Sequence, residues 1–171
     1  MTTITENLYR YRTLWLIVGV LLPLDQLSKY WIVAHSGFSH GLYPPHGGME
    51  VIPGVFNLVY ATNYGAAWGL FSDYGHVLIA LGLLSLIAIY LLRRDLELHT
   101  LQGQISFGLI ISGIVGNTTD RLVHGRVIDF LDVDLQFYRW PTFNFADCGI
   151  VVGALIYVWM NFRPRRKQAS R

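Results

Sequence analysis

Four long apolar segments alternate with more polar ones in this chain. Their extent predicts helices over about residues 14–34, 76–92, 101–120 and 143–162. A helix needs about 20 predominantly apolar residues to cross a bilayer, and each segment comes close to that length. The third helix has the least sharply marked beginning, near Leu101, because its apolar run starts only at Ile105. The pattern predicts an all-α membrane protein with four transmembrane helices.

Two longer loops, about residues 35–75 and 121–142, connect the first helix to the second and the third to the fourth. In the first loop, residues 50–62 are rich in β-branched and aromatic side chains and are interrupted by Pro53-Gly54. Such a segment is typical of short strands joined by a turn. We expect a small β-sheet on the outward membrane surface, within a single membrane-embedded domain that takes up residues 1–171.

Composition supports the membrane assignment. Of the 171 residues, 53% are hydrophobic and only 14% are charged, whereas a soluble domain has roughly 25% charged residues. A chain so apolar would not remain disordered in water. The single cysteine, Cys148, excludes an intramolecular disulfide and a C-x-x-C site.

The basic residues predict the orientation in the membrane. Nine of the 13 lie before the first helix, between the second and third, or after the fourth: Arg10, Arg12, Arg93, Arg94, Arg163, Arg165, Arg166, Lys167 and Arg171. Basic residues concentrate on the cytoplasmic side of membrane proteins. We therefore expect both termini to be cytoplasmic and both longer loops to face outward. The basic C-terminus is interpreted as an anchor that contacts membrane lipid, and we expect no nucleic-acid partner.

Ionisable side chains within membrane segments are costly and indicate functional sites. Here they form clusters: Asp25 with Lys29 in the first helix, Asn117, Asp120 and Arg121 at the end of the third, and Asp129, Asn144 and Asp147 around the start of the fourth. The outer ends of the third and fourth helices meet at one interface, so Asp129 and Asp147 can approach each other. Two carboxylates that share a proton can activate water against an amide. This chemistry needs no metal or cofactor, and the histidine spacing fits no metal site.

Simpler interpretations remain open for each group. Asp25 and Lys29 can form a structural ion pair, and Asp120 and Arg121 can form an interfacial cap or ion pair. Asp147 can stabilise the N-terminus of its helix. For the whole protein, the alternatives are a proton-coupled transporter that uses these acids as a relay and a non-catalytic subunit held by glycine-mediated packing.

Five motifs, in this order, resemble those of the bacterial lipoprotein signal peptidases, or type II signal peptidases. They are Asp25-Gln26-Leu27-Ser28-Lys29, Asn63-Tyr64-Gly65-Ala66-Ala67-Trp68-Gly69, Gly116-Asn117-Thr118-Thr119-Asp120-Arg121, Gly125-Arg126-Val127-Ile128-Asp129-Phe130 and Phe143-Asn144-Phe145-Ala146-Asp147. The resemblance implies four helices, a small outward sheet and a short interfacial helix near residues 65–72. It also implies a membrane aspartic endopeptidase that cleaves diacylglyceryl-modified prolipoproteins on the N-terminal side of the lipidated cysteine.

The same resemblance assigns the catalytic role to Asp129 and Asp147. It implies that the supporting and substrate-binding residues are Asp25, Lys29, Asn63, Gly65, Trp68, Asn117, Asp120, Arg121 and Asn144. Of these, Asn63 and Arg121 are expected to contact or position substrate, and Trp68 to hold the peptide extended. The enzyme is expected to lie in the bacterial cytoplasmic (inner) membrane, with its active site near the outer leaflet, as a monomer that globomycin inhibits.

Overall fold

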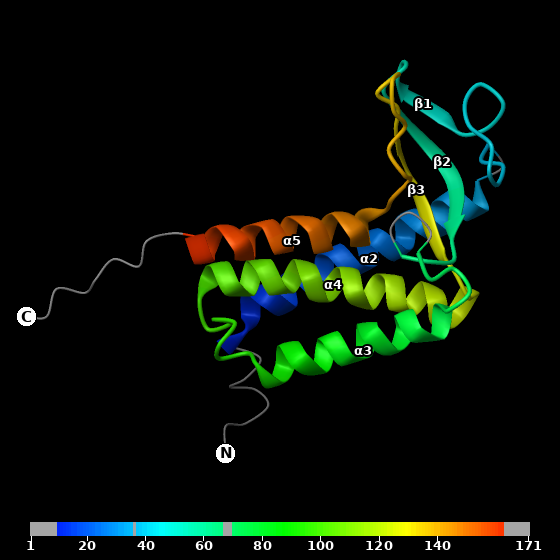
Figure 1. The fold of residues 1–171 in the computed structure, drawn as a ribbon. Coiled ribbons are helices and arrows are strands. Elements are labelled where there is room, and N and C mark those ends of the chain that lie inside the picture. Colours follow the sequence, from blue (N-terminus) through cyan, green and yellow to red (C-terminus); the bar gives the residue numbers. More distant parts are fainter. Residues whose placement is uncertain (1–9, 36, 67–69, 163–171) are drawn as a thin grey trace, which may run out of the picture.

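A computed structural model describes residues 10–35, 37–66 and 70–162, which form four helices and a three-stranded sheet (Figure 1). The helices are α2 (Arg12–Ala34), α3 (Gly75–Leu91), α4 (Leu101–His124) and α5 (Phe145–Phe162). The strands are β1 (Met49–Ile52), β2 (Phe56–Asn63) and β3 (Val127–Val133). Four helices with a small sheet were predicted, and this arrangement is confirmed.

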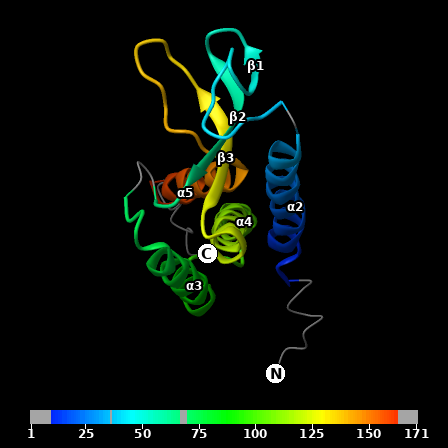
Figure 2. The same cartoon turned by 90° about the vertical axis from the view of Figure 1, so that its right-hand side faces the viewer.

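Helix α4 lies at the centre of the bundle and packs against α2, α3 and α5 (Figure 2). Small residues permit the closest of these contacts. A Cβ atom on Gly113 of α4 would collide with the carbonyl group of Ala146, and one on Gly153 of α5 would lie 2.6 Å from the carbonyl oxygen of Ser106. Glycine at these positions lets the helix backbones approach closely, as is common in membrane helix pairs.

The helices around α4 present apolar surface to their surroundings. Among the described residues, α2 and α5 are long and apolar enough to cross a membrane, while α3 is apolar over 17 residues. Helix α3 has no buried residue, and Leu81, Leu84 and Ile87 on it are largely exposed. A helix that is apolar all round needs an apolar environment, so this surface fits a lipid bilayer.

Two helix boundaries differ from the expected ones for identifiable reasons. Helix α4 continues to His124 instead of ending near residue 120, because the buried Asn117 and Asp120 have partners inside the protein. It ends at Gly125, whose φ of 70° is left-handed. Helix α5 begins at Phe145 instead of residue 143, because the backbone of Phe143 still exchanges hydrogen bonds with Leu131.

The sheet stands at the end of the bundle where α2 and α4 finish (Figure 1). Its order is β1-β2-β3, and both pairs are antiparallel. Ala61 faces Asp129 across the β2–β3 pair, next to a shift in register after Leu58. The sheet thereby connects the first loop directly to the strand that carries Asp129.

The short helix expected near residues 65–72 falls partly on residues 67–69, which lie outside the described part of the chain. On either side, residues 64–66 form a bend and residues 70–73 form turns. The described residues of this segment are therefore not helical.

Candidate active site

The beginning of α5 holds Asp147 in a defined orientation. The side chain of Asn144 accepts a hydrogen bond from the Asp147 backbone N–H at 2.9 Å, and the Asp147 carboxylate accepts one from the Asn144 backbone N–H at 3.2 Å. This reciprocal pair is a capping box, here formed by Asn and Asp three residues apart. The fold uses the helix start to position the carboxylate.

Asn144 also reaches the second aspartate of the predicted pair. Its Nδ2 donates to Asp129 Oδ1 at 2.7 Å, from the residue before the start of α5 to strand β3. Asn144 itself is fully buried, and Asp129 is only 2% exposed. Asn117 of α4 donates to the other carboxylate, with its Nδ2 2.7 Å from Asp147 Oδ1. Both aspartates are therefore held by amide side chains of neighbouring elements.

Asp129 and Asp147 line the same cavity, which has a volume of about 540 Å³. Polar groups from the first loop and α4, including Asn63 and Arg121, face this cavity from one side. Apolar side chains of α5, such as Val151, line another side and are exposed. A polar end with two carboxylates thus adjoins an apolar wall, the combination that an amphipathic substrate requires.

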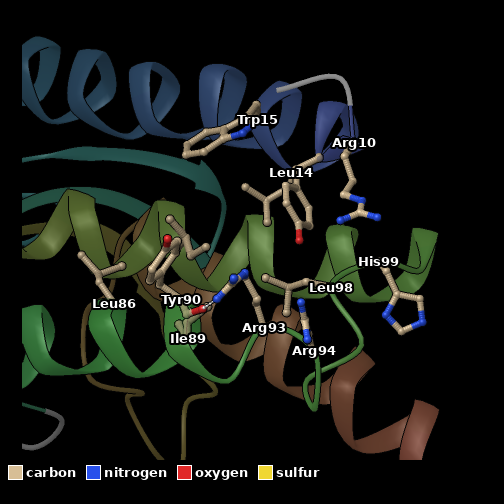
Figure 3. A pocket seen from close by; sticks show the side chains of 12 residues that line it. Arg10, Leu14, Trp15, Leu86, Ile89, Tyr90, Arg93, Arg94, Leu98 and His99 are labelled. Carbon is tan, nitrogen blue, oxygen red and sulfur yellow. Dashed lines mark hydrogen bonds between the residues drawn. The ribbon is translucent and has the colours of Figure 1, made fainter. Parts of the chain in front are cut away.

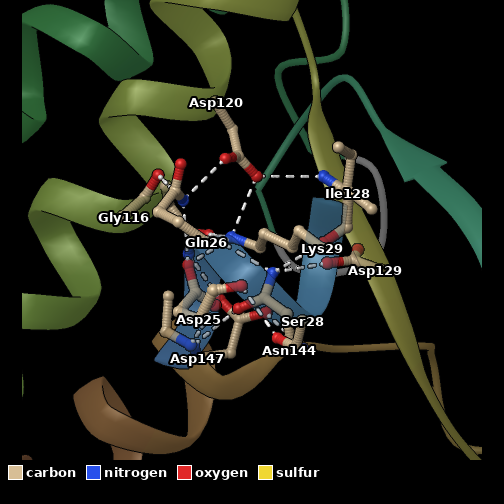
Figure 4. Close-up of polar contacts among 12 residues, drawn as sticks. Asp25, Gln26, Ser28, Lys29, Gly116, Asp120, Ile128, Asp129, Asn144 and Asp147 are labelled. Atoms are coloured by element: carbon tan, nitrogen blue, oxygen red, sulfur yellow. Dashed lines mark hydrogen bonds and ion pairs between the residues drawn. The ribbon is translucent and has the colours of Figure 1, made fainter. Parts of the chain in front are cut away.

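A buried ion-pair network lies behind the two aspartates (Figure 4). Lys29 Nζ lies 2.8 Å from Asp25 Oδ2 and 2.9 Å from Asp120 Oδ2, and all three side chains are at most 2% exposed. The ion pair between Asp25 and Lys29 was one of the open interpretations, and it is present. The ion pair suggested between Asp120 and Arg121 is not among those of the described residues, where Asp120 instead pairs with Lys29 of the neighbouring helix α2.

The two acids of this network connect α2 to the elements that carry the candidate catalytic pair. Asp25 Oδ1 accepts a hydrogen bond from the backbone N–H of Ala146 at 2.9 Å, directly before Asp147. Asp120 Oδ2 accepts one from the backbone N–H of Ile128 at 3.1 Å, directly before Asp129. The network therefore fixes the backbone on the N-terminal side of both aspartates.

Arg121 joins the first loop to α4. Its Nη2 donates to the carbonyl oxygen of Gly65 at 2.6 Å, and its Nε is buried without a partner among the described residues. Asn63 accepts a hydrogen bond from the Gly65 backbone N–H at 2.9 Å. These three residues thus form one rim of the cavity. Trp68, the remaining candidate of this motif, lies outside the described residues.

Two residues of the site were not among the predicted ones. Gln26 donates to Asp25 Oδ2 at 3.1 Å and to Asp120 Oδ1 at 3.0 Å. Its position beside Asp25 in an otherwise apolar segment was a usable signal. Trp140 lines the cavity, and nothing in its local sequence distinguishes this role from that of an interfacial aromatic residue.

The environment raises the pKa of Asp129 from 3.8 to about 7. Removal from water is the main cause, and the negative charge of Asp147 adds to it. Hydrogen bonds from Asn144 and Asn63 act in the opposite direction. Near neutral pH this carboxyl group is thus able to hold or to release a proton. Among the described residues, no group of three or more His, Cys, Asp or Glu side chains could hold a metal ion.

Comparisons with known proteins agree with this arrangement. A family model described as signal peptidase (SPase) II matches residues 17–163. The lipoprotein signal peptidase of Psychromonas ingrahamii is 40% identical over 156 residues, covering 88% of this chain and 84% of that protein. The lipoprotein signal peptidase of Shewanella baltica (strain OS155) is 35% identical over 163 residues, covering 91% and 90%.

A solved structure has the same fold. It is a bacterial membrane enzyme determined by the in meso method at 2.3 Å resolution, and it superposes with a TM-score of 0.80 at 28% identity over 93% of both chains. A family match over most of the chain agrees with two aspartates that line one cavity and with an apolar helical exterior. The chain therefore belongs to the signal peptidase II family, the membrane aspartic peptidases that remove signal peptides from prolipoproteins.

Proposed function

We propose that Asp129 and Asp147 are the catalytic pair, and that they hydrolyse the peptide bond on the N-terminal side of a diacylglyceryl-modified cysteine. The observation that carries this proposal is Asn144, which hydrogen-bonds to both carboxylates at the wall of one cavity. One carboxylate takes a proton from the attacking water, and the other gives a proton to the departing amine. The bond cleaved is the amide C–N bond, and water supplies the hydroxyl group of the new acid.

The resting proton belongs on Asp129 in this mechanism. Its carboxyl group is removed from water, and its pKa is raised to about 7. Asp147 is partly buried as well, but it accepts hydrogen bonds on both oxygens, from Asn117 and from the Asn144 backbone, in the first turn of α5. Hydrogen-bond donors and a helix N-terminus stabilise a negative charge. Asp147 is therefore the base that activates water, and Asp129 is the acid.

The remaining candidate residues either bind the substrate or position the catalytic pair. Asp25, Lys29, Asn117, Asp120 and Asn144 position the two aspartates through the contacts described above. Asn63, Gly65 and Arg121 bind the substrate backbone, for which the buried Nε of Arg121 offers a free donor within the described contacts. Trp68 holds the peptide extended. The exposed apolar face of α5 lets the acyl chains of the substrate remain in the bilayer while its peptide bond enters the cavity.

Membrane orientation follows from charge. With Arg93 and Arg94 at the cytoplasmic side, the sheet and the cavity face outward, near the outer leaflet of the bacterial cytoplasmic membrane. All four helices then cross the membrane as one domain. The enzyme works as a monomer, and globomycin inhibits it by occupying the cavity.

The test is cleavage of a purified precursor in detergent by the full chain and by three variants. Asp129→Asn and Asp147→Asn each abolish cleavage of the diacylglyceryl-modified precursor, whereas Asp134→Asn, which changes a partly exposed acid of the same loop, retains it. The unlipidated precursor is cleaved poorly by every form. Near-normal turnover by either dyad variant with unchanged thermal stability would refute the catalytic assignment, and equal cleavage of both precursors would refute the substrate class.

A further inference from the structure

A second cavity, of about 980 Å³ (Figure 3), lies at the end of the bundle where α2 begins and α3 ends, away from the sheet (Figure 1). It lies between the beginning of α2, the end of α3 and the first half of α4. The hydrolysis described above makes no use of it. We refer to it as the arginine groove, because Arg10, Arg93 and Arg94 all line it.

The three arginines approach the groove from two sides. Arg10 extends from the beginning of α2, and Arg93 and Arg94 extend from the end of α3 (Figure 3). Arg93 is held in place, because its Nη1 donates to the Tyr90 carbonyl oxygen at 2.7 Å and its guanidinium lies 4.7 Å from the Tyr90 ring centre. Three positive charges thus gather at one opening, with His99 beside them.

No aspartate or glutamate is among the described residues that line the groove. Asp95 and Glu97 belong to the same α3–α4 connection, but neither lines the groove. The opening is therefore suited to an anionic group that comes from outside the chain.

The groove walls are apolar below this charged rim. Leu14 and Trp15 of α2 face Leu86 and Ile89 of α3 across the space. Trp15 is 49% exposed, so the wall continues into the surface that faces lipid. A ligand that combines an anionic group with a hydrocarbon chain matches both parts, and basic pockets between membrane helices commonly bind acidic phospholipid headgroups.

We propose that the arginine groove binds one anionic phospholipid, with its phosphate at Arg10, Arg93 and Arg94 and an acyl chain along Trp15 and Ile89. The occupant is a lipid and not free phosphate, because the apolar walls extend the site well beyond what a small anion would fill. The site belongs to the membrane leaflet opposite to the peptidase cavity. It therefore binds a structural or regulatory lipid, separate from the lipidated substrate.

The test uses the full chain in nanodiscs of phosphatidylcholine that contain a diazirine-acyl phosphatidylglycerol probe. A phosphatidylcholine probe with the same diazirine chain is the neutral reference. After irradiation, mass spectrometry maps labelled peptides. We expect labelling around Trp15 and residues 86–89 to be enriched with the anionic probe, and added inorganic phosphate not to displace it.

The discriminating variant is Arg10→Gln/Arg94→Gln, which leaves Arg93 and its contact with Tyr90 intact. Each arginine near a membrane surface contributes about fivefold to the affinity for acidic lipid. The probe fraction for half-maximal labelling should therefore rise roughly 25-fold in this variant. Arg12→Gln is the matched control for the single variant Arg94→Gln, because each removes one positive charge and Arg12 does not line the groove.

Three outcomes would overturn the proposal. Equal labelling of the groove by both probes would mean that the site does not recognise an anionic headgroup. Equal losses in Arg12→Gln and in Arg94→Gln alone would mean that only general surface charge acts. Displacement by phosphate would identify a small-anion site. If the double variant does not fold, Arg94→Gln alone provides the same comparison, with an expected shift of about fivefold.

Discussion

Replacing Asp129 by asparagine should stabilise the protein at alkaline pH while it abolishes activity. In the folded protein the Asp129 pKa is about 7, against an ordinary value of 3.8. Because the folded state binds this proton more tightly than the unfolded chain, wild-type stability decreases as pH rises from about 4 to about 7. The asparagine variant carries no such proton, so its stability lacks this decrease.

The size of the effect follows from the same values. Each pKa unit corresponds to about 1.4 kcal/mol, so a rise from 3.8 to about 7 sets an upper limit of about 4 kcal/mol above pH 7. For a chain of this length, 1 kcal/mol changes the melting temperature by roughly 2–4 °C. The substituted amide oxygen can still accept the hydrogen bond from Asn144 Nδ2, so the contact at the site is retained.

The assay is thermal unfolding of wild type and Asp129→Asn in detergent, from pH 4 to pH 9. We expect similar melting temperatures near pH 4 and a difference in favour of the variant that grows up to pH 7 and then levels off. Asp134→Asn is the control with the opposite sign. The hydrogen bond from the Gln136 backbone and the contact with Arg139 lower the Asp134 pKa. Replacing Asp134 by asparagine should therefore lower the melting temperature slightly at neutral pH.

Two results would refute this reasoning. A variant less stable than wild type at pH 8 would mean that ionised Asp129 does not destabilise the folded state. A difference that stays constant between pH 4 and pH 8 would mean that the effect does not come from the Asp129 proton.

Three further predictions concern the same site. Lys29→Met leaves Asp25 and Asp120 buried without their cation and should cost about 3–5 kcal/mol; a change below about 1 kcal/mol in chemical unfolding would contradict this. Above about pH 7, kcat/KM should fall as Asp129 loses its proton, and a flat profile from pH 6 to pH 9 would argue against a proton shared by the pair. Asn144→Ala removes the amide that connects the pair and should lower kcat about a hundredfold, with the loss of about 1 kcal/mol expected for an N-cap. Asn144→Ser, which keeps the cap but not the amide, should restore that stability without restoring kcat.

A comparison of expected and observed helix ends shows how much of the fold the local sequence pattern predicts. The ends of α2, α3 and α5 lie within about two residues of those expected from apolar run length, because the cost of polar groups in a membrane acts on each segment separately. The end of α4 was placed four residues too early. Its polar side chains suggested an interface, whereas they are buried and satisfied by partners on α2 and α5.

Some contacts of the candidate site can likewise be predicted from residue spacing, and others cannot. Asn144 and Asp147 are three residues apart, so their capping contacts are local and readable from the spacing. The Asp25–Lys29 pair is readable too, because side chains four residues apart meet on one helix face. Asp120, by contrast, looked like the partner of its neighbour Arg121, although adjacent helical residues point in different directions.

Local sequence is enough to predict the membrane class, the four helices, the strand-forming loop and which polar residues are unusual enough to carry chemistry. These properties depend on the length of apolar runs and on spacings of three or four residues. Three long-range contacts, by contrast, depend on the folded arrangement of the elements: Lys29 joins Asp25 to Asp120, Asp25 holds the backbone of Ala146, 121 residues away, and Arg121 holds Gly65, 56 residues away. Such contacts arise where glycine lets α4 and α5 pack closely and where β3 pairs with β2, and no local pattern contains that geometry.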